Sequence, residues 1–207
     1  METYENLQLE LYRRDILKSA AIVGTVGTFG FPALSQRASA SSHQAETLYL
    51  VDSGGNIGDF SAKLFSVELD GSVSPPRANL TQLIEITDED YDRVHAIAAS
   101  PDGLTVYMID RDSKHLGSYE VSSDTFTDIG EIPGLPEEVV LASYSPDGDF
   151  FALSSDTDKM YIIDSSGPSA TEFVTITGAN VSGADIAFDV NGTLYLYANI
   201  PRKLYTI

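Results

Sequence analysis

The 207-residue sequence contains no cysteine. Disulfide bonds, thiolate metal sites, cysteine nucleophiles and a lipid-modified cysteine after a leader are therefore excluded, and stability has to come from packing. Tryptophan is also absent, and the only histidines are His43, His95 and His115, which form no recognisable triad or metal pair. No serine lies in a Gly-x-Ser-x-Gly elbow, and no glycine-rich segment opens a helix as a phosphate loop would.

Basic residues are scarce. Twelve lysines and arginines face 31 aspartates and glutamates, which gives a formal net charge of −19. That charge repels the phosphates of nucleic acids and of anionic lipids, so neither is expected as a partner. The carboxylates are spread over the whole chain, a composition typical of proteins from salt-loving archaea, although an ordinary acidic extracellular protein is an alternative.

The first forty residues have the three-part plan of a signal peptide. Arg13, Arg14 and Lys18 precede a weakly apolar run diluted by glycines, which ends near the small residues Ala38 and Ala40. The paired arginines resemble the twin-arginine export signal, so we expect cleavage after Ala40 and an extracellular or cell-surface location. An uncleaved anchor is the alternative, but the apolar run is shorter than the roughly 20 residues that span a membrane. After signal removal no stable membrane insertion is expected.

Beyond a linker at 41–46, the chain repeats with a period in the forties, which is typical of β-propellers. The turn Ser-Pro-Asp-Gly at 100–103 returns 45 residues later at 145–148, and Asp-Val-Asn-Gly follows after another 44 at 189–192. Proline presets φ, and glycine tolerates positive φ, so these segments are expected to be hairpin turns. The turn residues are Pro101, Asp102, Gly103, Pro146, Asp147, Gly148, Asn191 and Gly192.

Short runs rich in Val, Ile, Tyr and Phe flank these turns, and four such antiparallel strands make one propeller blade. The sequence therefore predicts an all-β fold with at least three four-stranded blades and a partial fourth, within a propeller region at 47–207. We expect blades at about 47–87, where no first strand is obvious, at 93–132 and at 138–177. The partial blade covers 184–207.

With its Ser-Pro-Asp-Gly turns and Leu-Tyr-x-Ile/Val third strands, the region at 47–207 resembles the extracytoplasmic propeller proteins of the YVTN and quinoprotein-like superfamily. The resemblance implies a ring that closes with six to eight blades. The chain would then be a fragment of a larger ring, or its incomplete blades would self-associate between chains; a four-bladed ring is the third alternative. It does not imply an activity, because that superfamily contains binding proteins, surface-layer proteins, lactonases and dehydrogenases.

The segment at 88–92 concentrates oxygen ligands of the kind that calcium prefers, with Asp88, Asp90 and Asp92 as candidate metal ligands. Arg93 stands where an EF-type loop needs its glycine, and the alternative is a hydrated acidic loop. No cofactor is predicted. Three N-glycosylation motifs lie in or near expected turns of an exported chain, at Asn79, Asn180 and Asn191.

These features lead to three hypotheses. The first is an exported, non-catalytic propeller that binds a protein or a carbohydrate through the loops between its blades. The second is a lactonase-like hydrolase whose site lines the central channel at the ends of first strands, where the sequence offers Asp92, His95 and Asp185. The third is a structural component of the cell surface.

Overall fold

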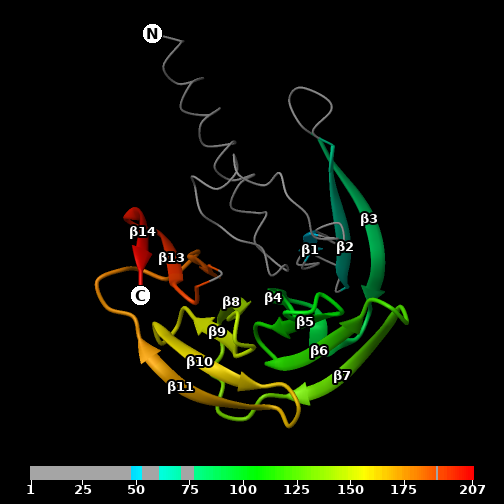
Figure 1. Cartoon of the computed structure of the whole chain (residues 1–207). Helices are drawn as coiled ribbons and strands as arrows, with labels where there is room; N and C mark the ends of the chain where they lie inside the picture. The colour runs from blue at the N-terminus through cyan, green and yellow to red at the C-terminus, as the bar shows by residue number, and fades with distance from the viewer. Residues whose placement is uncertain (1–47, 53–60, 71–76, 190) are drawn as a thin grey trace.

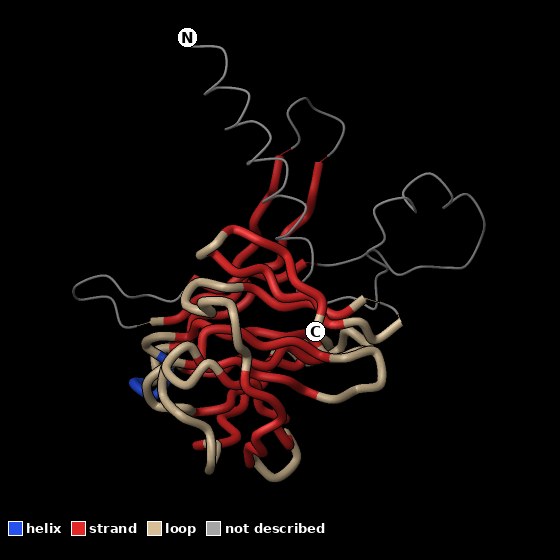
Figure 2. Tube along the Cα trace, turned by 90° about the vertical axis from the view of Figure 1, so that its left-hand side faces the viewer, coloured by secondary structure: helices blue, strands red, loops and turns tan. Residues whose placement is uncertain are grey.

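A computed structural model of the chain describes residues 48–52, 61–70, 77–189 and 191–207. The signal residues Arg13, Arg14, Lys18, Ala38 and Ala40, the linker at 41–46 and His43 lie outside the described residues. Figure 2 shows that strands make up most of the described chain. In that part of the chain, no helix has the length and apolar character needed to cross a membrane.

The strands form four antiparallel sheets in chain order, each made of consecutive strands. The first contains β1 (Leu48–Asp52), β2 (Ala62–Asp70) and β3 (Arg77–Ile86), and the second contains β4 (Val94–Ala99), β5 (Thr105–Asp110), β6 (His115–Glu120) and β7 (Thr125–Glu131). The third contains β8 (Val139–Tyr144), β9 (Phe150–Ser154), β10 (Lys159–Asp164) and β11 (Ser169–Thr175), and the fourth contains β12 (Asp185–Phe188), β13 (Leu194–Asn199) and β14 (Arg202–Thr206). A short 3₁₀ helix, η3 (Glu89–Tyr91), precedes β4.

The four sheets follow one another around an arc (Figure 1), with β4 beside β8 and β8 beside β12 on its inner side. The all-β propeller fold expected from the sequence is confirmed. The second and third sheets have four strands each, and the fourth ends with its third strand. The first sheet shows three strands, β1, β2 and β3, which take the places of the second, third and fourth strands of a full blade; residues before Leu48 lie outside the described residues.

The hairpins that join the first and second strands of a sheet turn at the repeated motif. Its glycine has a positive φ in all three copies, where a side chain would be strained: 71° at Gly103, 95° at Gly148 and 82° at Gly192. The glycine amide donates to the first residue of the turn, at 2.8 Å to Ser100 O, 3.1 Å to Ser145 O and 3.0 Å to Asp189 O. Asp189 stands where the other two turns have a serine. Its Oδ1 accepts hydrogen bonds from Asn191 N and Thr193 N, so this turn also has a side-chain acceptor for its backbone amides.

Three apolar clusters fill the spaces between neighbouring sheets. The third strands contribute Leu64, Leu116 and Met160 at equivalent positions, and none of these side chains is exposed to solvent. Burying a side chain of this size stabilises the fold by about 1.5–3 kcal/mol. Each residue lies in the cluster that its sheet shares with the next sheet, so the core consists of repeated sheet-to-sheet junctions.

Candidate binding cavity

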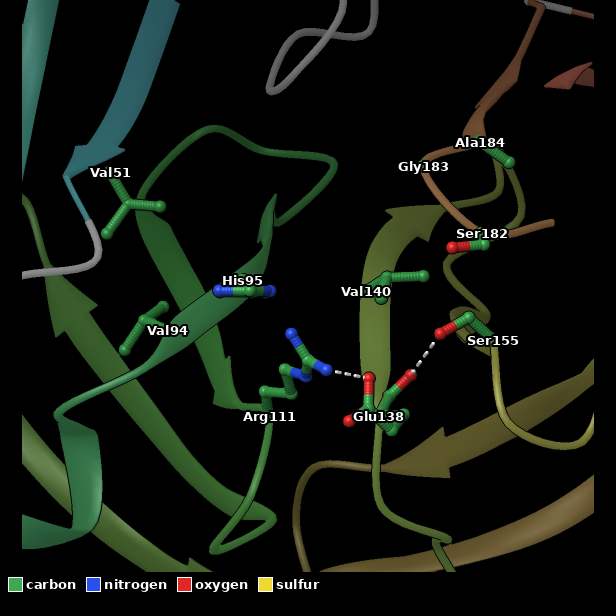
Figure 3. A pocket seen from close by; sticks show the side chains of 10 residues that line it. All are labelled: Val51, Val94, His95, Arg111, Glu138, Val140, Ser155, Ser182, Gly183 and Ala184. Carbon is green, nitrogen blue, oxygen red and sulfur yellow. Dashed lines mark hydrogen bonds and ion pairs between the residues drawn. The ribbon is translucent and has the colours of Figure 1, made fainter. Parts of the chain in front are cut away.

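A cavity of about 450 Å³ lies at one end of the inner strands, and residues associated with all four sheets line it. Val51 comes from β1, His95 from β4 and Val140 from β8, while Ala184 immediately precedes β12. Figure 3 shows Arg111 and His95 on one side of this space and Glu138 and Ser155 on the other. The size falls within the range of small-ligand sites.

Arg111, directly after β5, connects the second and third sheets across this cavity. Its Nη2 forms an ion pair with Glu138 Oε2. Its Nε is buried and has no hydrogen-bond partner among the described residues, and the carboxylate oxygen Asp112 Oδ1 is 3.7 Å away. A buried donor without an acceptor costs about 1–3 kcal/mol, so this guanidinium has hydrogen-bonding capacity that the described residues do not use.

Glu138 is held in a conformation that is uncommon for its residue type. Its φ of 61° lies in the left-handed region, although it precedes the first strand of a sheet instead of lying in a hairpin turn. Its amide donates to Arg111 O at 3.1 Å, and its carbonyl oxygen accepts from Ser155 N at 3.0 Å. Backbone strain of this kind costs about 1–3 kcal/mol and is concentrated at functional sites.

The loop that carries Arg111 is anchored by the fully buried carboxylate of Asp110. Asp110 Oδ2 accepts from Arg93 N at 2.7 Å, and its Oδ1 accepts from Asp112 N and Ser113 N, both at 2.9 Å. In the third sheet, Ser154 ends the second strand in the same way and donates its hydroxyl to a backbone carbonyl. The side chain at this position therefore fixes the path of the loop beside the cavity.

His95 faces the cavity as a neutral imidazole at neutral pH. Burial lowers its pKa, and the positive charges of Arg111 and Arg93 lower it further. A neutral imidazole offers one hydrogen-bond donor and one acceptor. This is the one residue of the predicted channel group that lines the cavity.

The other two residues of that group are not brought to the cavity lining. Burial raises the pKa of Asp92, as do the negative charges of Asp110 and Asp112, but Asp92 does not line the cavity. Asp185 lies on the innermost strand of the fourth sheet, and part of the residue is exposed. The protein atoms around its carboxyl group remove water from it, and this desolvation raises the pKa of Asp185 to about 6. The structure therefore does not assemble the expected trio.

The candidate calcium ligands also serve other purposes. Asp88 caps η3, where its Oδ1 accepts from Asp90 N at 3.0 Å, and Asp90 Oδ2 lies 3.7 Å from His115 Nδ1. His115 Nδ1 is also 3.3 Å from Asp128 Oδ1. Across the described residues, no three His, Cys, Asp or Glu side chains gather in a way that could hold a metal ion. A calcium site at Asp88, Asp90 and Asp92 stays a prediction, and the described side chains of Asp88 and Asp90 have the other partners given above.

The three predicted glycosylation asparagines are exposed. Asn79 lies within β3, opposite Glu68, and not in a turn. Asn180 forms a bridge with Ile200, and its Oδ1 accepts from Ser182 N at 2.8 Å. Asn191 lies in the turn between β12 and β13.

Sequence reasoning missed Arg111, Glu138 and Ser155. One signal was available, because Arg111 and Ser155 are the first residues after the second strands of neighbouring sheets. The backbone repeats there as well: Arg111 N donates to Arg93 O, and Ser155 N donates to Glu138 O, both at 3.0 Å. In the second and third sheets, the residue that follows the second strand is thus placed at the cavity.

No protein-family model matches the chain, and no curated protein matches it. Solved structures with similar folds include a chain of a nidogen/laminin complex, at 15% identity and a TM-score of 0.51, covering 77% of this chain and 60% of that one. Catalytically inactive virginiamycin B lyase from Staphylococcus aureus with quinupristin has 15% identity, a TM-score of 0.49, and coverage of 79% and 53%. An auxiliary nutrient binding protein from Bacteroides thetaiotaomicron has 14% identity, a TM-score of 0.45, and coverage of 70% and 38%.

The chain thus spans between 38% and 60% of the length of these three structures. At such low identity the likeness concerns the fold and not the activity. The neighbours are β-propeller proteins, and the arc of four antiparallel sheets has the same architecture. The described part of the chain is a β-propeller array.

Proposed function

We propose that this protein is an exported, non-catalytic propeller that binds a small hydroxyl-rich ligand, such as a sugar, in the cavity that Arg111, Glu138 and His95 line. The observation that carries the proposal is a cavity of about 450 Å³ whose lining combines the Arg111 guanidinium, the Glu138 carboxylate and the His95 imidazole. Ligand hydroxyls can donate to the carboxylate and accept from the guanidinium.

The mixture of groups around the cavity favours a neutral, hydroxyl-rich ligand over an anion. Hydroxyls both donate and accept, so they can pair with the Glu138 carboxylate, the Arg111 guanidinium and the His95 imidazole. Valines at the lining supply apolar contact for the carbon face of a sugar ring. An anion would instead meet the carboxylates of Glu138 and Asp112 on a chain whose net charge is −19.

Binding to an array of neutral and acidic oligosaccharides in molar potassium chloride tests this function. We expect neutral sugars to bind the full chain, and the Arg111→Gln variant to lose at least tenfold in affinity because it removes the guanidinium. Arg77→Gln is the matched control, since it makes the same change at an exposed position on β3. Parental affinity in Arg111→Gln, or binding to a peptide array and to no sugar, would contradict the proposal.

The proposal also places the protein outside the cytoplasmic membrane, exported by the twin-arginine route. The paired arginines, the glycine-diluted apolar run and the small residues before position 41 support it. Intact mass spectrometry of the exported protein should give a mature chain that begins at Ser41, with added mass where Asn79, Asn180 or Asn191 carries a glycan. Retention in the cell after Arg13→Lys with Arg14→Lys is expected, and unchanged export of that variant would refute the route.

A further inference from the structure

One apolar position is exposed on the fourth sheet, although the equivalent position is buried on each of the other three sheets. Leu64, Leu116 and Met160 occupy equivalent positions on the third strands, and each is 0% exposed against the following sheet. Leu204 occupies this position on β14, 44 residues after Met160, and it is 55% exposed. Tyr197, which lies opposite Leu204 in the register of β13 and β14, is also exposed. We call the side of the fourth sheet with Tyr197 and Leu204 the trailing face.

The first sheet has the complementary defect on its opposite side. Met108 and Ala152 are 0% exposed and Leu196 is 1% exposed, and each is buried against the preceding sheet. Leu50 holds the equivalent position on β1 and is 42% exposed. Leu69 and Leu80 are exposed as well. In the antiparallel register, Leu50 lies opposite Phe65 and Leu80 lies opposite Val67, so Leu50, Leu69 and Leu80 are on the same side of the first sheet. We call this side the leading face.

We propose that the trailing face of one copy of this chain packs against the leading face of a second copy, and that the two copies close one eight-sheet ring. Each internal junction already joins a trailing side to a leading side. The described part of the chain exposes one face of each kind, so two copies can form two head-to-tail junctions of the type that repeats inside the chain. Rings of four to eight blades are established for propellers, and the arc in Figure 1 leaves its two end sheets apart.

Charge sets the conditions for this association. Two copies with a net charge of −19 each repel one another at low ionic strength. The screening length falls from about 10 Å at 0.1 M salt to about 3 Å at 1 M, which leaves the apolar contact to dominate. The dimer is therefore expected in molar salt and is expected to dissociate when salt is removed. This inference does not depend on the ligand proposed for the cavity.

Light scattering after size exclusion tests the ring with the full chain in molar potassium chloride, over a hundredfold range of concentration. We expect twice the monomer mass for the parent. Leu50→Glu and Leu204→Glu should each weaken the dimer at least tenfold, because every junction uses one residue of each kind. Leu104→Glu is the matched control, as Leu104 is 47% exposed beside the Gly103 turn, on neither face, and this variant should remain dimeric.

Mixing the variants tests the head-to-tail arrangement. Leu50→Glu keeps an intact trailing face and Leu204→Glu an intact leading face, so an equimolar mixture retains one unaltered junction and should form more dimer than either variant alone. Far-UV circular dichroism should be unchanged, because both leucines are exposed in the monomer. A parent protein that stays monomeric at all concentrations overturns the proposal. A dimer that only one of the two variants weakens also overturns it, because that result indicates contact between two copies of the same face.

Discussion

The buried carboxylate of Asp110 offers a sharp test of how the cavity loop is held. Asp110→Ala removes the acceptor of three backbone amides, at 2.7, 2.9 and 2.9 Å. A hydrogen bond to a charged group contributes about 1.5–3 kcal/mol, and losing the buried charge returns part of this sum. We expect the free energy of unfolding to fall by about 3 kcal/mol, which corresponds to a drop in Tm of roughly 6–12 °C for a chain of this length.

Urea unfolding in molar potassium chloride measures this change as a shift of the midpoint at constant slope. Asp110→Asn should fall between the parent and Asp110→Ala, because its amide oxygen can still accept from Asp112 N and Ser113 N while its NH₂ group faces Arg93 N. Asp147→Ala is the control, since Asp147 is exposed in a hairpin turn, and it should change stability by less than about 0.5 kcal/mol. A loss below about 1 kcal/mol for Asp110→Ala would refute the anchoring role.

Three other predictions concern the fold. Tyr91→Phe removes a 2.6 Å hydrogen bond to Asp128 Oδ1 and should cost about 1.5–3 kcal/mol in urea unfolding; an unchanged midpoint would refute it. Gly117→Ala should cost about 1–3 kcal/mol in thermal unfolding, because a Cβ there would lie 2.5 Å from a ring carbon of Phe126; a parental Tm would contradict this. The pKa of Asp185 is raised from its usual 3.8 to about 6 in the folded protein. Between these pH values the folded state binds more protons at Asp185 than the unfolded state does, so this residue lowers stability as the pH rises. Asp185→Asn should remove this part of the pH dependence, and identical unfolding curves from pH 4 to 6.5 would exclude it.

The sheets were predictable from the sequence because the information that defines them is local. Proline and glycine at fixed spacing specify hairpins, and the alternating Val, Ile, Leu and Tyr residues specify strands that pair with their neighbours in the chain. Gly103 and Gly148 therefore indicated where the sheets turn without reference to any distant residue.

The cavity was predictable only in part. His95 was placed in a first strand and does face the cavity, but Arg111 and Glu138 meet because two sheets pack side by side, which no local pattern records. The left-handed backbone of Glu138 has no signature in a residue that is not glycine. The acidic run at 88–92 shows another limit of sequence reasoning, since closeness in sequence does not by itself direct side chains to one ion; Asp88 caps η3 and Asp90 lies beside His115.

The order of the strands has a consequence for how such a chain changes over time. Every sheet is a run of consecutive strands, and from the second sheet onward equivalent positions lie about 44 residues apart. A duplication or deletion of one such segment leaves every other hairpin intact and replaces one junction with another of the same type. Ring size in this architecture can therefore change by whole blades through a single genetic event, with no rerouting of the remaining chain.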